Sequence, residues 1–230
     1  MSKERLYIFD TTLRDGAQTQ GVDFSLEDKE KIALALDNLG VDYIEAGWPG
    51  ANPTDTEFFQ KKHDFKNSKL TSFGMTKRSG RSAENDTGLS ALMNSNTSAV
   101  CLVGKSWDFH VDVALGITNE ENLDNISESA KHFVKAKKEF MFDAEHFFDG
   151  YKANPKYALS CIKAAYDQGA RWVILCDTNG GTLPHEVTQI VSEVTKVVPG
   201  KNLGIHAHNC LLYTSPSPRD RTRSRMPSSA

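Results

Sequence analysis

Two histidines near the end of the sequence, His206 and His208, are candidates for metal chemistry. One residue separates them at the end of an apolar run, and residues i and i+2 of a strand point to the same side. Two imidazoles that converge on one point suit a divalent transition metal, whereas a single histidine is usually structural. With a carboxylate as third ligand, positions would remain open for water or a chelating substrate, as in catalytic sites.

A suitable carboxylate lies in the motif Asp10–Gly16 (DTTLRDG). Asp15 can bind a hard or borderline metal, Arg14 is a permanent cation with fixed donors, and Gly16 allows a sharp backbone turn. The alternative is an Arg–Asp pair that only stabilises a loop. We predict that Asp15, His206 and His208 bind one divalent metal.

Two further segments with polar side chains follow predicted strands: Asp143–His146 (DAEH) and Cys176–Gly181 (CDTNGG). Glu145 could accept or return a proton near the metal, or form a salt bridge across the site. Thr178 could hydrogen-bond a substrate carboxylate, and Asp177 is expected to brace its loop.

These residues need a scaffold of strands and helices. Strands are predicted at Leu6–Phe9, Tyr43–Ala46, Leu70–Phe73, Ala99–Val103, Phe140–Phe142, Trp172–Leu175 and Leu203–His206. The fully apolar runs are typical of parallel strands buried on both faces. Helix starts are predicted at Ser25, Thr54, Thr118, Pro155 and Pro184, with Gly40 ending the first helix.

The alternation of strands and helices indicates βαβ units, which fit either a doubly wound open sheet or a barrel. No G-x-G-x-x-G motif follows the first strand, which argues against a dinucleotide-binding fold. Polar residues follow nearly every strand, and a barrel gathers all its strand ends at one mouth. We therefore predict an α/β fold, an incomplete (β/α)8 TIM barrel with about seven strands and the eighth missing.

The composition limits the possible functions. The 230 residues are 39% hydrophobic, and 27 Lys+Arg nearly balance 30 Asp+Glu, which excludes a disordered acidic or basic chain. The net charge of -3 gives no reason to expect nucleic acid as a partner. No apolar run is long enough to span a membrane, and no targeting segment is recognisable, so we expect a cytoplasmic protein. Cys101, Cys161 and Cys176 are expected to be small buried residues rather than disulfide partners.

The last twenty residues, LLYTSPSPRDRTRSRMPSSA, have the composition of a disordered tail. They also resemble a translated sequencing adapter, the alternative being a native basic tail. We therefore predict a truncated catalytic barrel domain at 1–209 and a non-homologous segment at 210–230.

Together, DTTLRDG and the motif His206–Asn209 (HAHN) resemble the signature of one enzyme family. Its members are metal-dependent enzymes that condense acetyl-CoA with 2-oxo acids: the 2-isopropylmalate, homocitrate and citramalate synthases, with hydroxymethylglutaryl-CoA lyase as a relative. The resemblance covers about residues 5–209. Three stretches are more similar to citramalate synthases than to the others: Glu45–Pro53, Lys105–His110 and Asp143–Pro155.

The resemblance implies an acyltransferase of isoleucine biosynthesis that converts acetyl-CoA and pyruvate into (R)-citramalate and CoA. It implies a divalent metal (Mn, Mg, Zn or Co) and a homodimer. The alternatives are a 2-isopropylmalate or homocitrate synthase, a retro-Claisen lyase, and an inactive fragment. We expect Trp48 and Phe142 to narrow the pocket for the oxo acid.

The resemblance also implies a role for each site residue. Asp15, His206 and His208 would bind the metal, Arg14 would stabilise the substrate carbonyl and developing alkoxide, Glu145 would hydrogen-bond the reacting oxo group, Thr178 would bind the pyruvate carboxylate, and Gln18 would lie near the acyl donor. The general base remains open between Glu145, acting through a water, and a histidine outside this sequence. The family continues after Asn209 with an acidic residue and an apolar helix, where this sequence has Cys210 and the tail. Because the eighth strand and the last helices of the barrel are then missing, we expect this chain by itself to be inactive and poorly folded.

Overall fold

A computed structural model describes residues 5–208 of the chain. The predictions for Asn209, Cys210 and the tail at 210–230 lie outside the described residues. No helix in the described part is long and apolar enough to cross a membrane.

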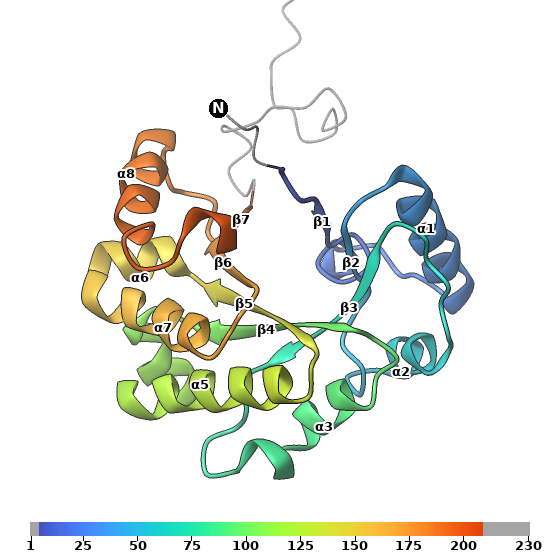
Figure 1. The fold of residues 1–230 in the computed structure, drawn as a ribbon, viewed down its shortest axis with the longest axis horizontal. Helices are drawn as coiled ribbons and strands as arrows, with labels where there is room; N and C mark the ends of the chain where they lie inside the picture. Colours follow the sequence, from blue (N-terminus) through green and yellow to red (C-terminus); the bar gives the residue numbers. More distant parts are fainter. Residues whose placement is uncertain (1–4, 209–230) are drawn as a thin grey trace, which may run out of the picture.

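Seven parallel strands form one sheet in the order of the sequence. They are β1 (Phe9–Asp10), β2 (Tyr43–Glu45), β3 (Lys69–Met75), β4 (Ala99–Lys105), β5 (Glu139–Glu145), β6 (Trp172–Asp177) and β7 (Leu203–Ala207). The sheet curls into an arc with the helices on its outer side, and β1 and β7 lie at the two edges (Figure 1). This arrangement confirms the predicted incomplete barrel.

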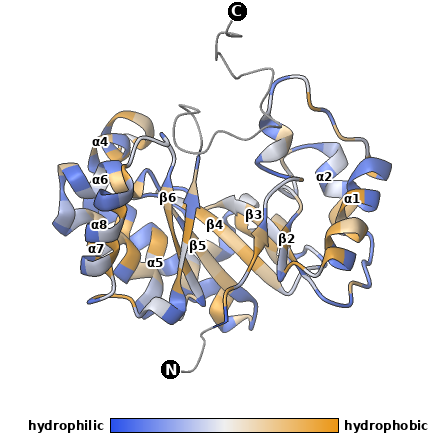
Figure 2. Cartoon of the chain, turned by 90° about the horizontal axis from the view of Figure 1, so that it is seen from above, coloured by the Kyte–Doolittle hydropathy of each residue, from blue (hydrophilic) through white to orange (hydrophobic). Residues whose placement is uncertain are grey.

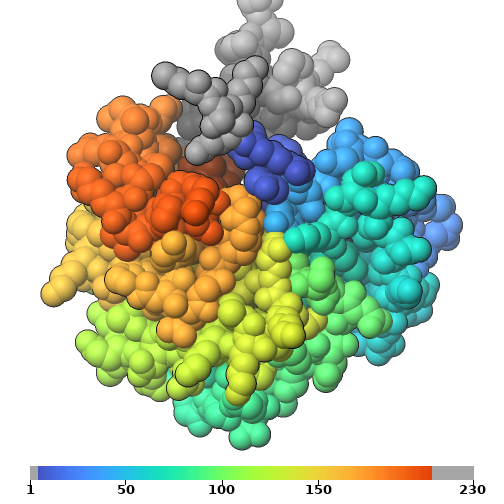
Figure 3. All heavy atoms as spheres, viewed as in Figure 1, coloured from blue at the N-terminus to red at the C-terminus, as the bar shows by residue number. Residues whose placement is uncertain are grey.

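Helices connect the strands around the outside of the arc. They are α1 (Leu26–Leu39), α2 (Pro53–Gln60), α3 (Thr87–Met93), α4 (Asp108–His110), α5 (Asn119–Lys135), α6 (Phe147–Ala153), α7 (Pro155–Asp167) and α8 (Pro184–Val194). The colours of Figure 3 follow the sequence round the molecule, because each βα unit packs beside its neighbours in the chain.

The predicted helix starts are confirmed except at α2. Ser25 and Asp28 form a reciprocal capping box at the start of α1, and Thr118 caps α5. At α2 the cap is Asn52, not Thr54, because the Asn52 side chain accepts a hydrogen bond from the backbone N–H of Asp55. Asparagine is a strong N-cap, and the proline after it fits the first helical position.

The first strand is shorter than predicted and begins later. The sequence predicts Leu6–Phe9, whereas β1 spans Phe9–Asp10 and pairs with β2 alone. Leu6 and Ile8 are 82% and 51% exposed. The prediction failed here because an edge strand lacks the second neighbour that would extend the ladder and cover its apolar side chains.

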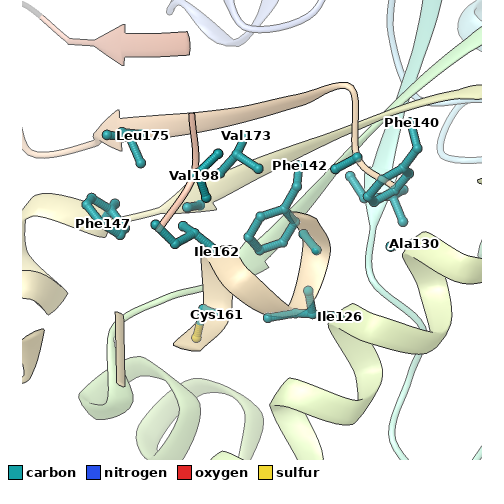
Figure 4. Packing of buried hydrophobic residues seen from close by; sticks show 14 of the residues in the cluster. Ile126, Ala130, Phe140, Phe142, Phe147, Cys161, Ile162, Val173, Leu175 and Val198 are labelled. Atoms are coloured by element: carbon teal, nitrogen blue, oxygen red, sulfur yellow. The ribbon is translucent and has the colours of Figure 1, made fainter. Parts of the chain in front are cut away.

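The apolar side chains of the strands divide into two layers. An inner layer within the arc comprises Tyr43, Phe73, Ala99, Cys101 and Met141, with Trp48, Val103 and Ile174 packed against it. An outer layer lies between the sheet and α5, α7 and α8; Figure 4 shows part of it, and Figure 2 shows the hydrophobic residues gathered on the central strands. Cys101, Cys161 and Cys176 are buried free thiols, as predicted.

The prediction for Phe142 was wrong. Phe142 is fully buried in the outer layer, beside Ile126 and Ile162, and does not line the pocket described below (Figure 4). Successive strand residues point to opposite faces, so an inward Asp143 requires an outward Phe142.

Candidate active site

A pocket of about 250 Å³ lies at the carboxyl ends of the strands. Its lining includes all seven residues that the sequence predicts to bind the metal or the substrates or to take part in the reaction: Arg14, Asp15, Gln18, Glu145, Thr178, His206 and His208. Trp48, Phe73, Met75 and Val103 form an apolar wall, and Lys105, Asp143 and Cys176 complete the polar side. The structure therefore brings together side chains from both ends of the described chain.

The three predicted metal ligands converge in this pocket. Oδ2 of Asp15 lies 3.5 Å from Nε2 of His206 and 3.5 Å from Nε2 of His208. Ligands bound about 2.1 Å from a tetrahedral ion are separated by about 3.4 Å. Both measured separations match this value, and the three donor atoms all lie within 4.8 Å of one another, so the group is suited to a divalent metal.

Local backbone structure explains how Asp15 reaches the pocket. The carbonyl oxygen of Thr11 accepts hydrogen bonds from the N–H groups of Arg14, Asp15 and Gly16, at 3.1, 2.9 and 3.1 Å. This tight turn directly after β1 lets consecutive side chains reach different partners. Arg14 contacts Glu45, whereas Asp15 contacts His206 and His208.

The histidine pair is held by the neighbouring strand. His206 pairs with Cys176 of β6, and the backbone N–H of His208 donates to the carbonyl oxygen of Asp177 at 3.2 Å. The Asp177 carboxylate accepts from the N–H and the hydroxyl of Thr182, so Asp177 braces its loop as predicted.

Protonation also favours Asp15 as a ligand. A hydrogen bond from His206 holds the pKa of Asp15 below its usual value, although partial burial acts in the opposite direction. The same hydrogen bond raises the pKa of His206. Asp15 is therefore a carboxylate, the form that binds a metal.

A second group of possible ligands shares His206. Its other members are Asp143 and Cys176, whose donor atoms lie within 4.8 Å of one another and of His206. Both are buried, and burial raises the pKa of each above its ordinary value. Because a metal ligand must lose its proton, the group containing the ionised Asp15 is the better candidate.

Arg14 is fixed on three sides. Its Nε donates to Oε2 of Glu45 at 2.6 Å, its Nη1 lies 3.3 Å from Oδ1 of Asp15, and its guanidinium stacks 4.0 Å from the Phe73 ring centre. Burial lowers the pKa of Arg14, but the negative charges of Glu45, Asp143 and Asp15 together outweigh this effect. The pKa of Arg14 therefore lies above its ordinary value. The Arg14–Asp15 pair considered as a simple loop brace does form, and the same contacts fix the guanidinium in the wall of the pocket.

The buried carboxylates beside Arg14 lacked an assigned role in the sequence-based prediction. Glu45 is 0% exposed, and its Oε1 has no hydrogen-bond partner among the described residues. Burial raises the pKa of both Glu45 and Asp143. The sequence did contain a signal for this inner-face position, because side chains of a strand alternate between its two faces. Glu45 lies two residues after Tyr43, and Asp143 lies two residues after Met141, so both share the inner face with these apolar residues.

Glu145 and Thr178 each have a partner in the structure. The Glu145 carboxylate forms an ion pair with Lys105 at the end of the neighbouring strand, whereas the alternative considered from the sequence was a salt bridge across the mouth of the barrel. The hydroxyl oxygen of Thr178 accepts from the backbone N–H of His146 at 2.9 Å. Both side chains nevertheless line the pocket.

A second pocket of about 430 Å³ adjoins the first. The two share Arg14, Gln18, Trp48 and Phe73 as a common wall. Trp48 therefore lines the pocket that it was predicted to narrow, and the narrowing itself stays a prediction; Gln18 also lies in the wall common to the two pockets.

The fold and the site are those of an α/β barrel with a possible metal site at its mouth. The model of the HMGL-like family matches residues 5–212, and the chain belongs to this family. It is 54% identical to (R)-citramalate synthase of Aquifex aeolicus (strain VF5) over 208 residues, and 32% identical to 2-isopropylmalate synthase 1 of Caldanaerobacter subterraneus subsp. tengcongensis over 215 residues. These alignments cover 90% and 92% of the chain, but 39% and 52% of the relatives.

Among solved structures, HMG-CoA lyase of Bacillus subtilis matches with a TM-score of 0.75 at 18% identity. The match covers 90% of this chain and 70% of the lyase, and it supports the barrel fold. The chain spans about 39% of the length of the citramalate synthase that it matches, so the activity of a whole enzyme is a matter for proposal.

Proposed function

We propose that this chain is the barrel region of an acyltransferase that condenses acetyl-CoA with pyruvate to form (R)-citramalate and CoA. The observation that carries the proposal is the convergence of Asp15, His206 and His208 with Arg14 and Glu145 in one pocket. The 54% identity to an (R)-citramalate synthase supports the choice of substrates.

Asp15, His206 and His208 would hold the divalent metal, because their donor atoms are already spaced for one ion. A bound metal supplies Lewis-acid polarisation and a template for a chelating 2-oxo acid. Arg14 places a permanent positive charge next to Asp15, where the oxo group would become negatively charged. Its contacts with Glu45 and Phe73 keep the guanidinium in place, so little reorganisation is needed during the reaction.

Thr178 and Glu145 would act on the substrate from the opposite side of the pocket. The Thr178 hydroxyl can donate its proton to the substrate carboxylate while its oxygen accepts from His146. Glu145 would lie near the reacting oxo group and exchange a proton with it, directly or through a water. A base would remove a proton from the acetyl methyl group, whose carbon would then bond to the oxo carbon while the oxo oxygen takes up a proton. Water would hydrolyse the resulting citramalyl-CoA thioester, which releases CoA and makes the reaction irreversible.

The lining of the pocket and the identity to citramalate synthases together support pyruvate. The apolar side chains of Trp48, Phe73, Met75 and Val103 suit the methyl group of pyruvate better than the second carboxylate of 2-oxoglutarate. The choice of pyruvate over 2-oxoisovalerate is supported by the 54% identity to an (R)-citramalate synthase, against 32% to a 2-isopropylmalate synthase.

The test is an assay of the complete enzyme containing this barrel with acetyl-CoA and a panel of 2-oxo acids. We expect the highest kcat/KM with pyruvate and one CoA released per citramalate formed. A higher kcat/KM for 2-oxoisovalerate or 2-oxoglutarate would reject the substrate assignment. Cleavage of an acyl-CoA without net condensation would instead indicate a lyase.

A further inference from the structure

We infer that Lys105 is a positioning residue, which holds the Glu145 carboxylate at the rim of the pocket in the orientation needed to reach the oxo group. The inference rests on the proposed function, because it assigns a task to Glu145. It concerns a side chain to which neither the motifs nor the metal geometry gives a role.

The backbones of the two residues are fixed relative to each other. Lys105 and Glu145 are the last residues of β4 and β5 and are direct partners in the sheet register. Beyond them, Ser106 donates from its N–H and its hydroxyl to the carbonyl oxygen of Glu145, at 3.3 and 2.7 Å. Asn122 of α5 donates to the carbonyl oxygen of Lys105 at 2.8 Å. The strand ends therefore remain paired up to the mouth of the barrel.

The side chains meet inside the pocket lining. Nζ of Lys105 forms an ion pair with Oε2 of Glu145, and both residues line the pocket of the metal group. Among the described residues, Lys105 and Arg14 are the two Lys or Arg side chains in this lining. Arg14 is committed to Glu45 and Asp15, so Lys105 is the cation available to orient Glu145.

The Lys105–Glu145 pair contributes little to folding stability. The side chains of Lys105 and Glu145 are 18% and 26% exposed, so solvent partly screens the pair and it contributes less to folding than a fully buried pair would. Orientation matters more here, because a carboxylate misplaced by about 1 Å can cost about a hundredfold in rate. A charged partner that is fixed to the adjacent strand restricts the rotation of the glutamate side chain towards solvent.

The chain offers a matched control. Lys69 of β3 forms an ion pair with Glu139, the first residue of β5, at the opposite end of the strands. Lys69→Met and Lys105→Met thus each remove one lysine paired with a glutamate of β5, but one pair lies at the substrate pocket and the other lies away from it.

The experiment measures kcat and KM for pyruvate in the complete enzyme, together with Tm. We expect Lys105→Met to lower kcat about tenfold or more while KM changes less than about threefold, and Lys105→Arg to recover most of the loss. The Tm of Lys105→Met should stay within about 2 °C of the parent value, and Lys69→Met should retain the parent kcat. A kcat unchanged in Lys105→Met would overturn the inference.

A double-mutant cycle with Glu145→Gln tests whether Lys105 acts through Glu145. If it does, Lys105→Met should cause almost no further loss in the Glu145→Gln background, because there is no carboxylate left to orient. Fully additive losses would contradict the inference and would assign Lys105 a contact of its own with the substrate. If the parent enzyme condenses acetyl-CoA with none of the 2-oxo acids, the proposed function itself fails, and this result is distinct from an effect at Lys105.

Discussion

At the scale of single residues, His206 belongs to two of the three groups of possible metal ligands among the described residues, one with Asp15 and His208 and one with Asp143 and Cys176, so its loss alone cannot distinguish these two. His206→Ala should reduce metal content and turnover in either case. His208→Ala should lower metal affinity by about a hundredfold or more if the ligands are Asp15, His206 and His208, since even changes outside the ligand set cost 10–100-fold. Cys176→Ser should then retain the metal. Metal content measured by elemental analysis distinguishes the two groups.

The control for these variants is His185→Ala. His185 is exposed at the start of α8 and does not line the pocket, so its replacement should change neither metal content nor turnover. If Cys176→Ser lost the metal while His208→Ala kept it, the metal ligands would instead be Asp143, Cys176 and His206.

The sequence was most informative about residues that carry chemistry and least informative about those that support them. The convergence of Asp15, His206 and His208 could be predicted because their types and spacing are unusual at strand ends; their binding of a metal stays a prediction. The contact between Glu45 and Arg14 could not, because it joins β2 to the loop after β1 and depends on how the sheet curls. A salt bridge of Glu145 was considered as an alternative, but Lys105 could not be named as its partner, since the strand register was unknown.

At the scale of elements, Lys29 links α1 to the strand ends that shape the pocket. It is 4% exposed; its Nζ donates to the carbonyl oxygens of Leu13 and Ala46, at 3.1 and 2.8 Å, and pairs with Asp55 of α2. Lys29→Met should lower the free energy of unfolding by about 3–5 kcal/mol, because it leaves Asp55 as an uncompensated buried charge. Urea unfolding of the complete enzyme measures this loss.

Two further variants make the measurement specific. Lys31→Met removes an exposed lysine of the same helix, paired with Glu27, and should cost less than about 1 kcal/mol. Lys29→Met combined with Asp55→Asn should cost less than the sum of the single changes, since both charges are then gone. Equal losses for Lys31→Met and Lys29→Met would contradict the account.

Asp37 connects the end of α1 to the loop before β3. Its carboxylate accepts hydrogen bonds from the N–H groups of Lys66, Asn67 and Ser68, at 3.0, 2.8 and 2.8 Å. Burial acts to raise the pKa of Asp37, but these donors outweigh it and hold the pKa below its ordinary value. A lowered pKa in the folded state stabilises the fold above the unfolded pKa of about 3.9, and this stability is lost as the pH falls through the folded value.

Asp37→Asn should therefore cost about 1.5–3 kcal/mol of unfolding free energy at pH 7, and the difference from the parent should shrink below about pH 4. Unfolding by urea at several pH values provides the measurement. The exposed Asp167→Asn, which loses one pair with Lys163, should show a smaller cost at pH 7. A cost for Asp37→Asn that grows as the pH falls would contradict the predicted sign.

Element types followed from the sequence more reliably than their ends. The caps at Ser25 and Thr118 were predictable, because each depends on contacts within one helical turn. Asn52 was missed in favour of Thr54, although Asn52–Pro53 is the stronger helix start. The extent of β1 could not be predicted from local pattern, because it depends on which strands lie beside it.

At the scale of the whole molecule, the open arc has a consequence for stability. Within residues 5–208, β1 and β7 are not paired with each other, and Leu6, Ile8 and Ile205 on or beside these strands are exposed. Covering one such side chain contributes about 1.5–3 kcal/mol, against a total stability of about 5–15 kcal/mol. We therefore expect residues 1–230 expressed alone to be poorly soluble, to lack a cooperative thermal transition and to form no citramalate.

Calorimetry and the citramalate assay on this 230-residue chain provide the test, with a chain extended by a further βα unit as the comparison. Cooperative melting and activity of the 230-residue chain alone would show that the free edges are not limiting.

The central claim is that Asp15, His206 and His208 hold one divalent metal at the mouth of this barrel. Anomalous diffraction from crystals of the complete enzyme grown with Mn²⁺ and pyruvate tests it most directly. We expect one anomalous peak about 2.0–2.3 Å from Oδ2 of Asp15 and from Nε2 of both histidines. A peak bound by Asp143 and Cys176 instead, or no peak in the pocket at saturating Mn²⁺, would contradict the claim.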